Sequence, residues 1–258
     1  MSETRSRIKI PFQTALDLPP PFRLITLREL GDAFAHARAV AADEGAGTLV
    51  FVGRFDLAEF AVVLEPEEPL RTARCAFYAG LNALGDALLA RAPPERSITF
   101  RWPDAVYVEG GLVGGARLAW PAGADEDVPP NWLVFGATIR TVAMDAEEPS
   151  QFPLTSALAN EGFDDCAPAR VVESFARHLM ATFDTWREAG FGAIAKDYLA
   201  RLVPEKGLRR EIGENGDLTM RRVGTCNNIE RRDFVQALAV PSWLDPVTGA
   251  PRADGQCT

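Results

Sequence analysis

The stretch Ser97–Trp120, SITFRWPDAVYVEGGLVGGARLAW, decides the fold. Apolar and polar residues alternate at its start, so that Ile98, Phe100 and Trp102 share one side. This period of two is typical of a half-buried β-strand. A second short strand at 106–108 passes through a glycine turn into a third, which predicts a β-hairpin directly after the first strand.

Two adjacent glycines, Gly114 and Gly115, lie inside the third strand. Glycine weakens a strand, and it usually marks a β-bulge or a point where another group approaches the backbone closely. We therefore predict a bulge or a close contact at this part of the strand.

Length and composition are those of an ordinary globular protein. The chain has 258 residues, of which 47% are hydrophobic and 24% charged, enough for one large domain or a large domain with a small one. No stretch approaches the roughly 18 apolar residues that a membrane span needs. The charged N-terminus also lacks the apolar core of a secretory signal, so we expect no membrane partner.

Charge and side-chain chemistry exclude further classes. The formal net charge of −9 disfavours a general binder of nucleic acid or anionic membranes. The chain has two histidines and no C-x-x-C pair, so we predict no bound metal. Its four cysteines lie far apart, which favours free thiols in a reducing cytoplasm over a disulfide framework.

Apolar spacing and turn residues predict the remaining elements. A capping box at Thr26–Glu29 predicts the start of a helix whose apolar side includes Phe34 and Ala41 and which ends at Gly45. Further elements are strands at 47–52, 60–64 and 131–140, helices at 72–91 and 168–188, and a shorter helix after Gly190. After these come a hairpin at 208–222, a strand at 234–238 and a loop-like tail whose last residues we expect to be poorly ordered.

The motif Arg-Trp-Pro-Asp at 101–104, followed by Val-Tyr-Val, a glycine turn and Leu-Val-Gly, resembles the Lys-Trp-Pro-Asn-Asp…Lys-Leu-Ala-Gly core of biotin protein ligases. It is less similar to the related lipoate ligases and octanoyl transferases. The order of elements resembles that superfamily over roughly residues 25 to 220. The resemblance implies an α/β (α+β) fold, in which a mixed sheet carries helices on one side and a small β domain follows.

Three regions are expected from this resemblance. Residues 1–24 would form an extended lead-in, residues 25–204 the ligase-like α/β domain, and residues 205–258 the small C-terminal β domain with its loop-like tail.

The resemblance implies a site for an adenylated acid, but the phosphate-binding loop is reduced here. In biotin ligases a Gly-Arg-Gly-Arg-Arg-Gly loop covers the biotin and the adenylate phosphate, since its glycines admit backbone amides and its arginines neutralise charge. This chain keeps one Gly53-Arg54 pair within the short interval 53–59. Arg54 is therefore a candidate substrate-binding residue, and the loop has been lost or replaced from elsewhere in the chain.

Arg101 occupies the family's lysine position, beside the acyl carboxylate and the phosphate, which makes it the candidate catalytic residue. Arginine keeps the charge but is longer and forked, and the alternative is that it pairs with an acid on the sheet face. The family's Asp is replaced by Ala105, so a carboxylate that could take a proton from an acceptor lysine is missing. The other candidate substrate-binding residues are Trp102, Asp104, Gly114 and Gly115. For Trp102 a place in the core is the alternative.

The segment Gly136–Arg140 corresponds to the Gly-x-Gly-Ile-Asn of biotin ligases, which lines the nucleotide side of their site. Gly136 and Ile139 fit that pattern, whereas Thr138 and Arg140 replace its second glycine and its asparagine. Gly136 and Arg140 are the candidate cofactor-binding residues. Arg140 either holds a phosphate or fills the space meant for the nucleotide.

Two hypotheses for function follow from the resemblance. The first is a divergent biotin/lipoate protein ligase-like enzyme that uses ATP to attach or transfer a biotin-like, lipoyl or octanoyl group to a lysine of an acceptor protein domain. In its covalent variant a cysteine, with Cys166 as the candidate, would act as nucleophile. The second is a non-catalytic relative that binds a small carboxylic acid or a partner protein in the altered pocket. The altered motifs favour the second hypothesis for biotin chemistry specifically.

Overall fold

One mixed β-sheet forms the centre of the molecule. The structure, a computed structural model, describes residues 16–143, 155–222 and 229–252. Within them the sheet has the spatial order β1-β2-β3-β7-β6-β5-β4, with β1 parallel to β2 and all other neighbours antiparallel. Its strands are β1 (Arg23–Leu27), β2 (Thr48–Val52), β3 (Leu57–Leu64), β4 (Ile98–Arg101), β5 (Ala105–Val108), β6 (Gly111–Ala119) and β7 (Leu133–Arg140).

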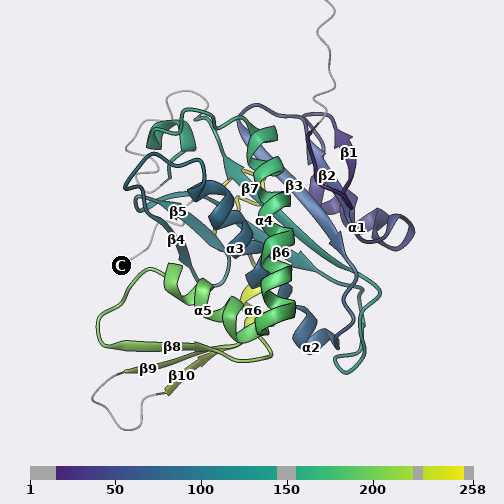
Figure 1. Ribbon diagram of the computed structural model, residues 1–258, viewed down its shortest axis with the longest axis vertical. Coiled ribbons are helices and arrows are strands. Elements are labelled where there is room, and N and C mark those ends of the chain that lie inside the picture. The colour runs from purple at the N-terminus through teal and green to yellow at the C-terminus, as the bar shows by residue number, and fades with distance from the viewer. Residues whose placement is uncertain (1–15, 144–154, 223–228, 253–258) are drawn as a thin grey trace, which may run out of the picture.

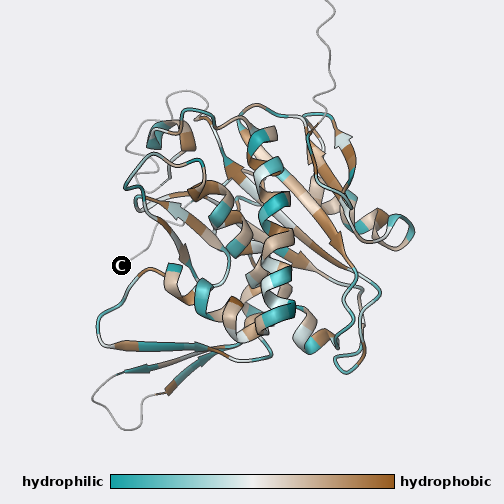
Figure 2. Ribbon diagram, in the orientation of Figure 1, coloured by the Kyte–Doolittle hydropathy of each residue, from teal (hydrophilic) through white to brown (hydrophobic). Residues whose placement is uncertain are grey.

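Helices cover both faces of this sheet. The helices are α1 (Ala33–Glu44), α2 (Leu70–Ala73), α3 (Ala76–Leu89), α4 (Pro168–Ala189), α5 (Phe191–Arg201) and α6 (Phe234–Leu238), with a 3₁₀ turn at Leu158–Glu161. Helices α3 and α4 pack on each other across one face (Figure 1). The predicted helix at 168–188 is confirmed as α4, whereas the one predicted at 72–91 is divided into α2 and α3. Figure 2 shows brown, apolar strands behind an α4 whose outer turns are teal and polar.

Helix α1 covers the opposite face, which we call the α1 face. Its apolar residues Phe34, Ala37 and Ala41 pack against β2, β3 and β7. Every residue of β2 is buried, because this strand is covered from both sides. The expectation that all helices lie on one side of the sheet is therefore wrong for α1.

The N-terminal part of the domain also differs from the expectation. Thr26 belongs to β1, and α1 begins later, at Ala33, where the Asp32 carboxylate accepts a hydrogen bond of 2.8 Å from the Ala35 amide. The capping-box pattern is a local signal, and pairing of β1 along β2 overrides it. The expected boundary between 24 and 25 thus falls inside β1, whereas the predicted helix end at Gly45 is confirmed.

A small antiparallel sheet follows α5. It consists of β8 (Leu208–Ile212), β9 (Leu218–Arg222) and β10 (Ile229–Arg232), and it lies at one end of the molecule (Figure 1). The predicted hairpin is confirmed. The predicted strand at 234–238 is wrong, because Asp233 caps a short helix there by accepting from the Gln236 amide, and Phe234 stacks on Tyr78 in the core.

The tail after α6 is irregular, as expected, but it is packed onto the main sheet. Trp243 is 1% exposed and lies on the α1 face with Ala105, Tyr107 and Leu112. The expectation of poor order concerns residues 253–258, which lie outside the described residues. In the described part of the chain no helix is long and apolar enough to cross a membrane.

Candidate functional site

The hairpin of β5 and β6 contains the bulge that its glycines predict. Val106 pairs with Gly114 but Tyr107 pairs with Leu112, so Val113 is the additional residue of a bulge. Gly114 has a φ of 159°, and a Cβ there would lie 1.9 Å from the Thr138 carbonyl oxygen. No side chain fits at this position, so glycine is required for β6 to pair with β7.

Cross-strand pairing places several candidate residues in one row on the α1 face. Arg101 lies opposite Ala105, Ala105 opposite Gly115, Gly115 opposite Thr138, and Thr138 opposite Glu59. Residues directly opposite one another in antiparallel strands point to the same face. Arg101, Gly115 and the polar end of β3 therefore belong to one surface.

Arg101 is exposed at the outer end of this row. Its guanidinium lies over the Tyr107 ring, 5.0 Å from the ring centre. With the described residues it makes no hydrogen bond or ion pair, in contrast to the alternative of an acid partner. An arginine oriented by an aromatic ring and left with its donors unused is suited to a bound anion.

Trp102 lies on the other side of the sheet. Its indole Nε1 donates a hydrogen bond of 3.0 Å to the Tyr78 hydroxyl, which in turn donates one of 2.6 Å to the Gly216 carbonyl. The side chain packs against the large core under α3 and α4. The structure thus places Trp102 in the core, the alternative considered for it, and apart from Arg101.

Asp104 and Gly115 are both contacted by the C-terminal tail. The buried Asp104 carboxylate accepts hydrogen bonds from the Ser242 hydroxyl (2.9 Å) and the Ser242 amide (3.3 Å). A Cβ on Gly115 would lie 2.4 Å from Nε1 of Trp243, which donates to the Ala116 carbonyl at 3.3 Å. The close approach that the strand glycines predict is therefore made by the chain's own tryptophan.

Burial dominates the electrostatics of Asp104. It raises the pKa of this carboxyl from 3.8 to about 7, although the hydrogen bonds from Ser242 favour the ionised form. A carboxyl that titrates near neutrality is able to exchange a proton at physiological pH.

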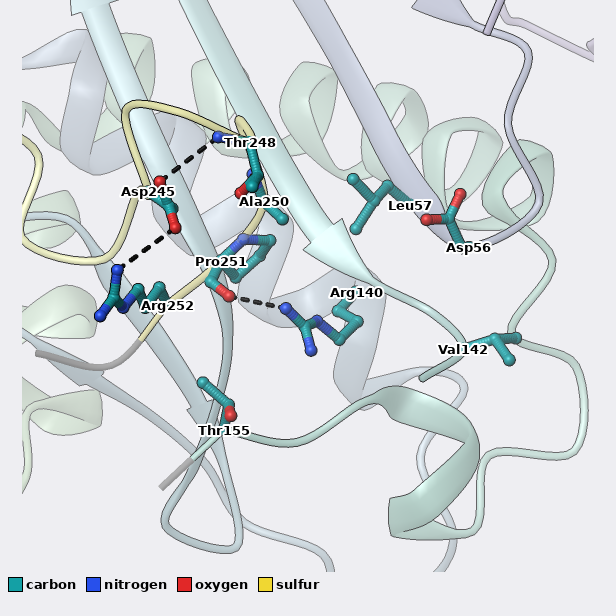
Figure 3. A pocket seen from close by; sticks show the side chains of 10 residues that line it. All are labelled: Asp56, Leu57, Arg140, Val142, Thr155, Asp245, Thr248, Ala250, Pro251 and Arg252. Atoms are coloured by element: carbon teal, nitrogen blue, oxygen red, sulfur yellow. Dashed lines mark hydrogen bonds and ion pairs between the residues drawn. The ribbon is translucent and has the colours of Figure 1, made fainter. Parts of the chain in front are cut away.

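Arg140 lies near the end of β7 and contacts the same tail. Its guanidinium donates a hydrogen bond of 2.7 Å to the Pro251 carbonyl, as Figure 3 shows. Together they border a cavity of about 190 Å3, which is lined from the sheet by Asp56, Leu57 and Arg140 and from the tail by Asp245, Thr248 and Pro251.

Arg54 is engaged within its own turn. It forms two parallel bonds with the Asp56 carboxylate, of 3.0 and 2.7 Å, and hydrogen bonding to Asp56 raises the pKa of Arg54. The β2–β3 connection runs only from Gly53 to Asp56. A connection this short cannot fold over a ligand.

The region around Gly136 is filled by α1. A Cβ on Gly136 would lie 2.5 Å from Cδ2 of Phe34, and the Arg117 guanidinium lies 4.4 Å from the centre of the same ring. Glu59 accepts a hydrogen bond of 3.0 Å from the Ala33 amide at the helix start. Burial raises the pKa of Glu59 and lowers that of Arg117.

Sequence reasoning missed Phe34, Glu59, Arg117, Ser242 and Trp243 as residues of this surface. The strand glycine at 115 signalled that another group would approach, but not which residue. Cys166 is half-buried and packs against the large core, with no described contact to the α1 face. Among the described residues, no cluster of three or more His, Cys, Asp or Glu side chains could hold a metal ion.

Comparison with known proteins identifies the family. A sequence model of the Biotin/lipoate A/B protein ligase family matches residues 18–200. The chain belongs to this family. No curated protein is significantly similar to it in sequence.

Solved structures of family members share its fold. A biotin protein ligase-like protein of unknown function from Silicibacter sp. TM1040 is 25% identical with a TM-score of 0.74, over 86% of this chain and 99% of that one. Biotin protein ligase from Aquifex aeolicus is 15% identical with a TM-score of 0.61, over 82% and 99% of the two chains. The same enzyme in complex with biotin and ATP is 14% identical with a TM-score of 0.58, over 81% and 98%.

Proposed function

We propose that this chain binds a small carboxylic acid on the α1 face and does not activate it with ATP. The observation that carries the proposal is Arg101, an exposed guanidinium held over Tyr107 and without a polar partner among the described residues. Its forked donors match the two oxygens of a carboxylate. The solved complex of the Aquifex enzyme contains biotin and ATP, which supports biotin or a similar compact acid as the ligand.

The β2–β3 turn argues against an ATP-dependent step. Phosphoryl charge requires backbone amides or free cations around it. Here the turn is short, and its single arginine is paired with Asp56. Arg140 is bonded to Pro251, so two of the arginines expected near the nucleotide are already occupied.

The test is calorimetric titration with biotin, lipoate and octanoate, each with and without ATP. We expect one acid to bind equally well in both conditions, and Arg101→Gln to weaken it at least tenfold. Arg96→Gln is the matched control, because Arg96 lies half-buried just before β4 and faces Glu109 instead. Binding that requires ATP together with the acid would overturn the proposal.

The second candidate function is ligation of the acid to a lysine of an acceptor domain. One observation favours it: the model of the Biotin/lipoate A/B protein ligase family matches the chain over residues 18–200. Pyrophosphate release from ATP in the presence of acid would identify this activity. For either function we place the protein in the cytoplasm, because Cys75 and Cys166 are free thiols.

A further inference from the structure

One segment of the chain contacts three positions that the sequence assigns to ligands. We call residues 241–252 the C-terminal segment. Ser242 binds Asp104, Trp243 lies against Gly115, and Pro251 accepts from Arg140. Asp104, Gly115 and Arg140 belong to three different elements, so a single piece of chain spans the whole surface between them.

The C-terminal segment is folded by contacts of its own. The Arg252 amide donates to the Trp243 carbonyl at 2.6 Å, and the Gly249 amide donates to the Asp245 carbonyl at 2.8 Å. The Asp245 carboxylate accepts from the Val247 amide at 2.8 Å. These bonds close the segment into a loop, and Figure 3 shows further bonds of Asp245 to Thr248 and Arg252 within it.

We infer that the C-terminal segment is a removable cover, which occupies the space where the proposed acid would lie and must leave before the acid binds. This inference rests on the proposed function.

The remaining space supports displacement over simultaneous binding. The cavity that the segment borders beside Arg140 measures about 190 Å3, and Arg101, Gly115 and Trp243 are not among its lining residues. Ligand sites typically measure about 300–1,000 Å3. Trp243 is fully buried over Gly115, next to the strand residues that Arg101 faces, so an acid whose carboxylate lies at Arg101 meets the indole.

The polar contacts between the cover and the rest of the chain include the bonds from Ser242 to Asp104, from Trp243 to Ala116 and from Arg140 to Pro251. The segment adds no strand to the main sheet. Its removal therefore leaves every strand pair of the sheet intact and exposes the Trp243 indole together with the residues packed against it, Ala105, Tyr107 and Leu112.

The first test measures amide hydrogen exchange in the full chain, using Trp243→Ala and the matched control Val247→Ala, whose side chain is 90% exposed in the same segment. We expect Trp243→Ala to accelerate exchange at 241–252 and to bind octanoate, lipoate or biotin at least tenfold more tightly than the wild type. The control should behave as the wild type in both measurements. Where an acid binds the wild type, faster exchange in Trp243→Ala with unchanged or weaker binding of that acid would overturn the inference.

A milder variant guards against general unfolding. Ser242→Ala removes the hydroxyl bond to Asp104 and keeps Trp243, so we expect a smaller change in the same direction. Exchange in β3 and β7 should stay as in the wild type in both variants. Faster exchange in these strands in both variants would show that the segment is a fixed part of the fold, which would overturn the inference. In the wild type, saturating acid should accelerate exchange at 241–252; slower exchange there would show that the segment closes over the acid, which contradicts our inference.

The second test needs no acid and separates the two proposals. A labelled synthetic peptide of residues 240–252 should bind the Trp243→Ala chain and should not bind the wild type, whose own segment occupies the face. No binding to either chain would overturn the inference. If the peptide binds Trp243→Ala but no acid binds any form, the proposed function fails while the separable cover stands.

Discussion

Asp104 is a buried residue of the α1 face whose protonation changes near neutral pH. Its carboxyl is buried and accepts a hydrogen bond from the Ser242 hydroxyl. Burial raises its pKa to about 7 from 3.8. Between pH 3.8 and about pH 7 the Asp104 carboxyl is therefore protonated in the folded chain and ionised in the unfolded chain.

This difference sets the sign of a pH effect. A raised carboxyl pKa stabilises the folded state at low pH, and that contribution is lost as the pH rises from about 4 to about 7. Asp104→Asn removes it. We expect the Tm of the wild type to fall relative to that of the variant between pH 5 and pH 8.

Thermal melts of the wild type and of Asp104→Asn between pH 5 and pH 8 measure this change. Asp43→Asn, an exposed position on α1, provides the control and should follow the wild-type profile. A Tm difference between wild type and Asp104→Asn that does not change with pH would refute the prediction.

Arg117 shows how the α1 face is filled at the residue scale. Its side chain is 20% exposed, lies over Phe34 and faces Asp32 at 3.7 Å. Much of its stabilising contribution comes from packing of the long side chain on the aromatic ring. We expect Arg117→Ala to lower the free energy of unfolding by about 1–3 kcal/mol.

Urea denaturation measures this loss. Arg38, which lies 5.8 Å from the same ring on the exposed side of α1, is the control. Arg38→Ala should change stability by less than about 0.5 kcal/mol. Equal effects of the two substitutions would show that the burial of Arg117 contributes nothing.

At the scale of elements, β6 depends on a glycine that no other residue can replace. Gly114→Ala would drive a Cβ into the Thr138 carbonyl, so β6 and β7 would have to separate. We expect a loss of more than about 3 kcal/mol in the free energy of unfolding, or no folded protein. Gly192→Ala in α5 is the control, because a Cβ there meets nothing within 4 Å.

Expression and denaturant melts of the two variants test this contrast. Gly192→Ala should be neutral or stabilising by about 0.4–1 kcal/mol, since alanine has less freedom than glycine in the unfolded chain. A Gly114→Ala chain as stable as the wild type would mean that the bulge adapts.

The elements that sequence predicts well are those with a long apolar period. The sides of α3 and α4 and the hairpin of β8 and β9 repeat over several turns or residues, so the prediction averages over many side chains. The start of α1 failed because a capping box involves only two side chains, Thr26 and Glu29. The segment 234–238 failed because five apolar-rich residues fit a strand or a helix equally well.

At the scale of the whole molecule, Tyr78 connects the two sheets. Its hydroxyl accepts from Trp102 beside β4 and donates to Gly216 in the β8–β9 turn. Tyr78→Phe leaves two groups without a partner in the interior, which costs about 1–3 kcal/mol. We expect faster hydrogen exchange in β8–β10 than in the main sheet of this variant.

Tyr198→Phe is the control for that experiment. Tyr198 is equally buried but donates to the Pro103 carbonyl, at the β4–β5 turn of the main domain. It should lower overall stability without a selective effect on β8–β10. Identical exchange patterns in the two variants would contradict the connecting role of Tyr78.

Only the part of the candidate site whose residues lie close together in the sequence could be predicted. Arg101, Asp104 and Gly115 lie within fifteen residues of one another, and strand alternation brings them together. Trp243 reaches Gly115 from the far end of the chain, and no periodicity spans that distance. Gly115 indicated that a group would approach the strand, but only the structure shows that this group is Trp243.

The short connection between α6 and the C-terminal segment has a consequence for any ligand screen. α6 ends at Leu238 and Ser242 is already bonded to Asp104, so residues 239–241 alone form the tether. A group on so short a tether acts as if it were present at a millimolar effective concentration. A free acid of micromolar affinity must compete with this high local concentration of the C-terminal segment. The wild-type chain then binds the acid weakly, although the acid site itself is intact. The Trp243→Ala chain is therefore the one to screen first.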